Sequence, residues 1–258
     1  FCNSGTEAVE ASIKIARRYF YNPDVTKNKT EILSFSGSFH GRTIGSLAAG
    51  GPDKLSIFNT NVNDFNLLEF GDHDSLQNSI NENTAAIIIE PIQGEGGVVV
   101  PDEGYLKNSK KLCEKYNVLF IADEIQTGIC RTGKMLACDH EEIKPDIVIL
   151  GKALSGGFYP VSGVLANSDI MGVLKVGQHG STFGGNPLGS VVAKESIKFA
   201  VDKDLSKNAR IMGDLFRNNL EKLKDKHKLI KKVRGKGLLN AIVLDCEESS
   251  KIPWQLSI

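Results

Sequence analysis

The chain has 258 residues, of which 41% are hydrophobic and 24% are charged. This composition is typical of a globular protein with a sizeable buried core, and the length predicts one large domain or one and a half. The 31 basic and 31 acidic residues cancel, which argues against an overall electrostatic attraction to nucleic acid or to an anionic membrane. No apolar run approaches the ~20 residues that a membrane-spanning helix requires.

Cysteine usage and the first residues bear on the compartment. The five cysteines form no CxxC pair, and an odd number in a chain of this length is weak evidence for a disulfide framework. We therefore expect reduced thiols in an intracellular protein, in the cytoplasm or, as an alternative, in the mitochondrial matrix. Residues 1–7 lack the charged leader and apolar block of a targeting sequence, so we expect the chain to begin inside a fold.

Apolar runs alternate with amphipathic stretches along the chain, which predicts βαβ units and a largely parallel sheet. Helical spacing of apolar residues predicts helices at residues 7–21 and 105–116, the first capped by Ser4 or Thr6. The sequence predicts a short strand at residues 32–35, and runs of apolar residues predict further strands at residues 85–89, 118–122 and 146–150.

Polar residues stand at the ends of three of these strands. Glu90 and Asp123 follow their strands directly, and Lys152 follows one glycine after its strand. Open α/β sheets bind their ligands beyond the carboxyl ends of the strands. We therefore expect a functional site where these three side chains stand.

The character of the sequence changes after Pro187. A charged helical region is predicted over residues 188–226, with a break near residues 202–204, and residues 233–244 are predicted to form a turn that leads into a strand. We place a domain boundary near residue 205. Residues 1–204 would form a large domain, and residues 205–258 would begin a smaller one.

Asp123, Gln126 and Lys152 form the first group of candidate functional residues, of which Asp123 and Lys152 are the candidate catalytic residues. A carboxylate beside a pyridine nitrogen keeps that nitrogen protonated, so the ring can act as an electron sink. A lysine amine can form a Schiff base with an aldehyde and then carry a proton at Cα. The alternatives are a helix cap for Asp123 and a solvated surface lysine for Lys152. The glycine-rich turn at residues 151–157 favours the catalytic interpretation.

Three further segments could bind a ligand. Residues 4–7 combine small side chains with a helix start, which suits a phosphate, although ordinary helix capping needs the same residues. In residues 36–43, Phe39 could stack on a ring and Arg42 could bind a carboxylate through two hydrogen bonds; the alternative is a glycine-rich loop with one core phenylalanine. The carboxylates of residues 90–97 would contact substrate or order their own loop.

These segments, in this order, resemble the class III (omega-amino-acid) aminotransferases of fold type I. Residues 123–128 and 131–133 are similar to the signature of that family, and Lys152 stands where the family has its cofactor lysine. The resemblance implies an α/β fold. Its large domain would carry a mostly parallel sheet flanked by helices and would bind pyridoxal 5'-phosphate, and a small α+β C-terminal domain would follow. Within the class, the ornithine aminotransferase branch is the most similar in three segments, residues 150–162, 179–189 and 233–241.

The resemblance also implies roles around the cofactor. Asp123 would pair with the pyridine nitrogen, Gln126 would hydrogen-bond the ring hydroxyl, and Thr182 would reach across a homodimer interface to the partner's phosphate. The predicted cofactor-binding residues are Gly5, Thr6, Phe39, His40, Asp123, Gln126, Lys152, Ser181 and Thr182. No metal ligand is predicted.

Two residues are predicted to bind substrate. By resemblance, Arg42 would hold the α-carboxylate of glutamate or 2-oxoglutarate, and Glu95 would mask a second arginine when ornithine binds. His40 departs from the tryptophan expected in the ornithine enzymes, whereas other members of the class carry histidine or tyrosine there. The family's N-terminal segment and most of its C-terminal domain are expected to be missing, and with them the residues that recognise the amino donor.

The predicted reaction transfers the δ-amino group of L-ornithine to 2-oxoglutarate, giving glutamate 5-semialdehyde and glutamate. Acetylornithine or 4-aminobutyrate are the alternative donors, and a non-catalytic fragment of the fold is an alternative of another kind. The expected partners are amino-acid and 2-oxo-acid substrates and a second copy of the chain, with no nucleic acid and no membrane. A NAD-binding protein is disfavoured because no GxGxxG motif follows the early strands.

Overall fold

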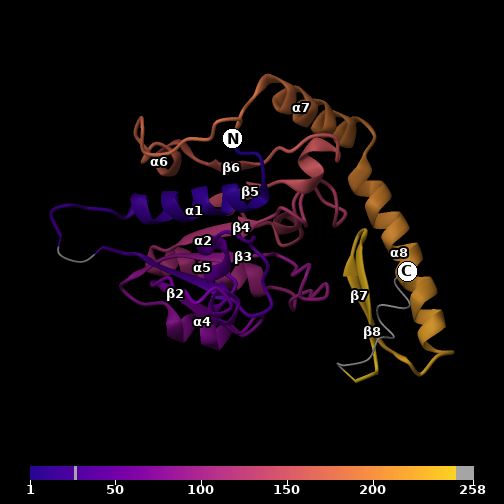
Figure 1. Ribbon diagram of the computed structural model, residues 1–258. Coiled ribbons are helices and arrows are strands. Elements are labelled where there is room, and N and C mark those ends of the chain that lie inside the picture. Colours follow the sequence, from indigo (N-terminus) through magenta and orange to yellow (C-terminus); the bar gives the residue numbers. More distant parts are fainter. Residues whose placement is uncertain (26–27, 248–258) are drawn as a thin grey trace.

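The computed structural model describes residues 1–25 and 28–247. Its main body is a six-stranded sheet of order β2-β1-β3-β4-β5-β6, with helices on both faces (Figure 1). β1 to β5 pair in parallel, and β6 runs antiparallel to β5 at the edge. This arrangement confirms the predicted α/β class with a mostly parallel sheet. The strands are β1 (Glu31–Phe35), β2 (Phe65–Leu68), β3 (Thr84–Ile89), β4 (Leu119–Asp123), β5 (Ile147–Leu150) and β6 (Gly163–Ala166).

The four predicted strands are confirmed as β1, β3, β4 and β5, with ends shifted by one residue at most. All residues of β3 and β4 are buried, because helices cover both faces of the sheet. Ile88 and Ile121 belong to one hydrophobic core, and Ile87 and Phe120 belong to the core on the opposite face. A strand that is buried on both sides has no polar face, which explains why these segments are continuous apolar runs.

Helices cover the two faces of the sheet. α1 (Gly5–Tyr19) packs on one face, and α4 (His73–Ser79) and α5 (Tyr105–Tyr116) pack on the other. Ser4 is the N-cap of α1, and the carboxylate of Glu7 accepts hydrogen bonds from the backbone N–H groups of Asn3 and Ser4, both at 2.7 Å. Five short helical segments complete the main body, namely α2 (Ile44–Ala48), α3 (Pro52–Ser56), α6 (Ser168–Met171), and the 3-10 helices η1 (Ala137–His140) and η2 (Lys152–Ser155).

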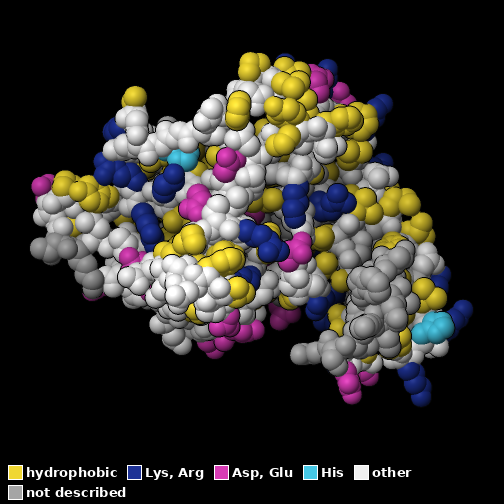
Figure 2. Space-filling model, viewed as in Figure 1, with side chains coloured by type: hydrophobic (Ala, Val, Ile, Leu, Met, Phe, Trp, Pro, Cys, Tyr) yellow, Lys and Arg dark blue, Asp and Glu magenta, His cyan; other side chains and the backbone are white. Residues whose placement is uncertain are grey.

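The long helical region after Pro187 is confirmed with its break. α7 (Pro187–Asp202) and α8 (Leu205–Lys224) are separated by two residues, and Asp204 takes a left-handed conformation with φ +47°. The Asp204 carboxylate accepts a hydrogen bond from Lys207 N at 3.2 Å, which caps α8. Figure 2 shows hydrophobic side chains gathered over α7 at the top of the view, where Leu188 and Phe199 are exposed.

A two-stranded antiparallel sheet, β7 (Ile230–Lys236) and β8 (Leu239–Leu244), lies beside α8 and apart from the main sheet (Figure 1). The prediction for residues 233–244 named one turn and one strand. In the structure the turn joins two paired strands, so the first of them, β7, was missed. Two hydrogen bonds tie this hairpin to the main body, from Leu238 N to Arg131 O at 2.9 Å and from Arg234 Nε to Gly97 O at 2.7 Å. The domain boundary near residue 205 stays a prediction, and residues 248–258 of the predicted second unit lie outside the described residues.

Within the described part of the chain, no helix is both long enough and apolar enough to cross a membrane. The five cysteines are free, and four of them are buried.

Candidate active site

The carboxyl ends of β3, β4 and β5 meet at one edge of the sheet and border a cavity of about 300 Å³. This is the position at which open α/β sheets bind ligands, and the volume is at the lower end for small-molecule sites. All predicted site residues except Ser181 and Thr182 line this cavity. The lining residues are Gly5, Thr6, Phe39, His40, Gly41, Arg42, Glu90, Glu95, Asp123, Ile125, Gln126 and Lys152.

Lys152 lies two residues beyond the end of β5, after Gly151, and is the first residue of η2. Its side chain is exposed, but it faces the cavity rather than an open convex surface. Its φ angle is +40°, a left-handed conformation that costs most residues other than glycine free energy and that is concentrated at functional sites. The backbone is therefore held in an unfavourable conformation at the position where the amine enters the cavity.

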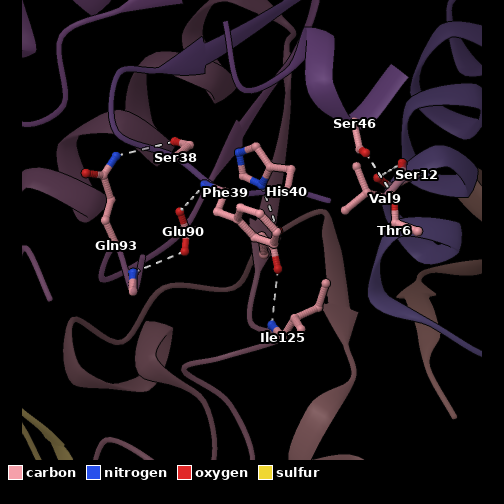
Figure 3. Close-up of polar contacts among 12 residues, drawn as sticks. Thr6, Val9, Ser12, Ser38, Phe39, His40, Ser46, Glu90, Gln93 and Ile125 are labelled. Atoms are coloured by element: carbon pink, nitrogen blue, oxygen red, sulfur yellow. Dashed lines mark hydrogen bonds and ion pairs between the residues drawn. The ribbon is translucent and has the colours of Figure 1, made fainter. Parts of the chain in front are cut away.

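Asp123 ends β4 and is buried at the wall of the cavity. Its Oδ1 accepts a hydrogen bond from Ile125 N at 3.1 Å, and its Oδ2 lies 2.7 Å from Nδ1 of His40 (Figure 3). Residues 125–130 form turns rather than an α-helix, so the alternative role of Asp123 as a helix cap is wrong.

Glu90 follows β3 and connects two loops of the site. Its Oε2 accepts a hydrogen bond from Phe39 N at 2.9 Å, and its Oε1 accepts one from Gly94 N at 3.2 Å (Figure 3). Burial raises the pKa of Glu90, and Asp123 raises it further, while His40 lowers it. These contacts match the loop-ordering alternative for this carboxylate.

Phe39 presents its ring to the cavity. The residue keeps 36% of its surface exposed, so the alternative of a core phenylalanine is wrong. The guanidinium of Arg42 lies 5.7 Å from the centroid of the Phe39 ring, within the range of a cation–π contact. An open aromatic face beside an exposed guanidinium is suited to a planar ring that carries an acidic substrate.

Gln126 and Glu95 meet across the cavity. Gln126 Nε2 donates a hydrogen bond to Glu95 Oε1 at 3.2 Å. A Cβ atom added at Gly94 would lie 1.6 Å from Gln126 Oε1, so the position of this amide depends on the glycine.

The N-terminus of α1 forms another wall. Gly5 and Thr6 are its first two residues, and the first amides of a helix have no partner inside the helix and attract anions. The Thr6 hydroxyl lies 2.9 Å from Ser46 Oγ and 3.1 Å from Thr43 Oγ1. Free amide donors and small side chains make this wall suitable for a phosphate.

Ser181 and Thr182 lie elsewhere, in a neighbouring cavity of about 420 Å³. Ser181 Oγ accepts hydrogen bonds from Asn3 Nδ2 and from Gly184 N, both at 3.1 Å. Thr182 therefore does not reach the Lys152 cavity of its own chain, and the roles of both residues stay predictions.

Two lining residues, Gly41 and Ile125, were given no role in the sequence analysis, and Glu90 was expected at the site without a predicted partner. Glu90 and Ile125 belong to segments that end strands, so their position was visible in the sequence. Their contacts were not, because Glu90 bonds to a residue 51 positions away. Among residues 1–25 and 28–247, no group of three or more His, Cys, Asp or Glu side chains could hold a metal ion.

The model of the aminotransferase class-III family matches residues 1–256. Ornithine aminotransferase 2 of Staphylococcus saprophyticus is 47% identical to the chain over 245 residues, which cover 94% of this chain and 61% of that protein. The chain therefore spans about three fifths of the length of this curated relative.

Solved structures agree in fold. An ornithine aminotransferase from Toxoplasma gondii, with partial occupancy of PLP at its active site, has a TM-score of 0.89 and 44% identity, covering 94% of this chain and 58% of that one. Acetylornithine aminotransferase from Elizabethkingia anophelis has a TM-score of 0.85 and 48% identity, covering 98% and 61%. A family model that matches nearly the whole chain, together with relatives at this identity, shows that the chain belongs to the class-III aminotransferases.

Proposed function

We propose that the full-length protein is an aminotransferase that binds pyridoxal 5'-phosphate in the Lys152 cavity. One observation carries this proposal, namely that Lys152 and Asp123 line the same cavity of about 300 Å³ at the ends of the neighbouring strands β5 and β4. Membership of the family implies this cofactor, and the T. gondii relative holds it at its active site.

The residues of the cavity fit the cofactor group by group. A buried carboxylate, Asp123, suits a protonated ring nitrogen, and the open face of Phe39 suits the ring. The backbone amides of Gly5 and Thr6, at the start of α1, suit the phosphate. The amine of Lys152 suits the aldehyde.

When bound, the cofactor supplies an electron-withdrawing ring that stabilises negative charge on the substrate carbon next to nitrogen. Asp123 would hold the ring nitrogen in its protonated form. Lys152 would hold the cofactor by its amine, and the same amine would move a proton to and from the substrate carbon that bears the amino group. Gln126 would bind the ring hydroxyl and so fix the ring opposite Phe39.

The proposed donor is L-ornithine, through its δ-amino group, and the proposed acceptor is 2-oxoglutarate. Arg42 would bind the α-carboxylate of the acceptor. Glu95 would mask a second arginine when the donor ornithine binds. Support comes from the S. saprophyticus relative, which is named an ornithine aminotransferase. N-acetylornithine is the second candidate donor, because the E. anophelis acetylornithine enzyme is 48% identical over 98% of the chain.

A donor panel tests this proposal. The full-length protein, loaded with pyridoxal phosphate, would be assayed with 2-oxoglutarate and with ornithine, N-acetylornithine or 4-aminobutyrate as donor. We expect glutamate formation to be fastest with ornithine. Lys152→Ala should abolish it, and Lys134→Ala, which changes an exposed lysine outside the cavity, should not. Faster turnover of acetylornithine would reassign the donor, and no turnover of any donor would contradict the function.

We further propose a homodimer in which each cofactor phosphate is shared between subunits. Thr182 lines a cavity other than the Lys152 cavity of its own chain. This position agrees with a contact from Thr182 to the cofactor phosphate of the partner subunit. The exposed apolar side chains of α7 are available for a subunit contact. The compartment, cytoplasm or mitochondrial matrix, stays a prediction.

A further inference from the structure

His40 and Asp123 form a buried pair in the wall of the cavity. Their side chains are 0% and 3% exposed, and His40 Nδ1 lies 2.7 Å from Asp123 Oδ2. An ionised carboxylate only accepts hydrogen bonds, so Nδ1 carries the hydrogen and donates it. Figure 3 shows the imidazole of His40 directed toward the same carboxylate that accepts from Ile125 N.

The second ring nitrogen of His40, Nε2, is buried and makes no hydrogen bond to the described residues. A buried polar atom without a partner costs free energy, whereas an apolar side chain of similar size would not. Space filling alone therefore does not account for a histidine at this position, and the contact from Nδ1 does.

The carboxylate of Asp123 is held at two points, one on each oxygen. Ile125 N donates to Oδ1 from the chain segment that follows β4, and His40 donates to Oδ2 from a loop 83 positions earlier. One hydrogen bond leaves a carboxylate free to rotate about it, and two bonds to different oxygens fix its plane. The hydrogen bond from His40 Nδ1 therefore sets the direction of the lone pairs of Asp123 that remain free to accept a further bond.

We infer that His40 is a positioning residue for Asp123, which holds the carboxylate in the orientation that binds the ring nitrogen of the cofactor. This inference rests on the proposed function. His40 does not need to touch the cofactor, so its effect should depend on the presence of a ring nitrogen.

Two variants and two probes test the inference in the full-length protein. His40→Leu removes the donor, and His40→Asn keeps an N–H donor at the place of Nδ1. The probes are pyridoxal phosphate and deazapyridoxal phosphate, in which carbon replaces the ring nitrogen. Dissociation constants would be measured by equilibrium dialysis, and thermal unfolding of each apoprotein would check the fold.

We expect His40→Leu to weaken binding of pyridoxal phosphate at least tenfold, since a hydrogen bond to a charged group is worth more than the ~1.4 kcal/mol of one tenfold step. Binding of the deaza analogue should change less than about twofold, the scatter expected for a contact that does not involve the ring nitrogen. His40→Asn should recover most of the affinity. In an Asp123→Asn background, His40→Leu should have no further effect on either probe.

Equal weakening of both probes by His40→Leu would overturn the inference, because the histidine would then only support the shape of the site. Unchanged affinity for pyridoxal phosphate would overturn it as well. Failure of the proposed function has a different signature, since the unmodified protein would then bind neither probe.

Discussion

At the scale of single residues, the site depends on small positions as much as on reactive ones. Lys152 and Asp123 bring the amine and the carboxylate, but Gln126 can occupy its place only because Gly94 has no side chain. Glycine here provides space rather than an unusual backbone angle.

Gly94→Ala tests this dependence. The new methyl group would displace the end of the Gln126 side chain and break its hydrogen bond to Glu95. Because a long side chain can move aside, the fold should survive, and cofactor affinity should fall by about tenfold, equivalent to one hydrogen bond of ~1.4 kcal/mol. Gln126→Ala should give the same loss. Gly163→Ala, where an added Cβ meets no atom within 4 Å, is the control, and a similar loss in that variant would contradict the argument.

Much of the site was predictable at this scale, and the reason is topological. Asp123 and Lys152 follow apolar runs, and parallel strands bring their carboxyl ends to one edge. The pairing of His40 with Asp123 was not predictable, because it depends on how a loop folds across 83 positions of sequence. The same holds for the contacts from Glu90 to Phe39 and Gly94.

At the scale of elements, the hydrogen bonds of Glu124 hold the segment after β4 in place. Glu124 is completely buried. Its carboxylate accepts hydrogen bonds from the Thr127 hydroxyl, Ala137 N at 3.0 Å and Cys138 N at 2.8 Å. Burial raises the pKa of Glu124, although these donors act in the opposite direction. One side chain thus joins the turn that carries Gln126 to η1.

Glu124→Gln should lower the free energy of unfolding by about 1–3 kcal/mol, because the amide NH2 cannot accept a bond and leaves a buried N–H without a partner. Denaturant unfolding measures this loss. Glu142→Gln, at an exposed carboxylate near η1, should leave the stability unchanged within about 0.5 kcal/mol. Unchanged stability in Glu124→Gln would contradict this argument, because it would mean that one acceptor oxygen at this position is enough.

His140, the last residue of η1, gives the fold a pH dependence. Burial lowers the pKa of His140 to about 4, and Lys236 and Lys134 lower it too, whereas the hydrogen bond with Thr132 acts oppositely. The unfolded chain takes up this proton near pH 6.5, so the unfolded state binds more protons as pH falls. The contribution of neutral His140 to stability is therefore present above pH 6.5 and is lost toward about pH 4.

His140→Gln should reduce the acid sensitivity of the melting temperature between pH 6.5 and about 4. Thermal unfolding at several pH values in this window measures the slope, and His227→Gln, at an exposed histidine, is the matched control. An identical slope in His140→Gln and in the unmodified protein would show that the imidazole titrates alike in both states.

The two strands of the main sheet that sequence patterns missed share one physical property. β2 and β6 are four-residue edge strands that are only partly buried. Asn66 interrupts the apolar residues of β2, and the apolar stretch of β6 is only four residues long. Central strands can be recognised in the sequence because both of their faces are covered and their residues are therefore apolar. Edge strands form by pairing with a neighbouring strand, and their own residues predict them poorly.

At the scale of the whole molecule, the proposed homodimer would share each cofactor phosphate between two chains. The test is a heterodimer of one Thr182→Ala chain with one Lys152→Ala chain, which leaves one lysine-bearing site, in the Thr182→Ala subunit. If Thr182 acts across the interface, that site receives the intact threonine of its partner and binds cofactor normally. The Thr182→Ala homodimer should bind about ten- to a hundredfold more weakly, for a lost bond of ~1.5–3 kcal/mol.

Weak binding in the heterodimer, equal to that of the Thr182→Ala homodimer, would mean that the contact is made within one subunit. Spectra of the cofactor at the remaining site, recorded during titration, distinguish the two outcomes.

The identity of the cofactor lysine decides whether the Lys152 cavity is the active site. Borohydride makes the link between the cofactor aldehyde and a lysine amine permanent, and peptide mass spectrometry of the reduced full-length protein locates it. We expect the label on Lys152, which lines the same cavity as Asp123. A label on Lys54, Lys134 or any other lysine, with Lys152 unmodified, would contradict it.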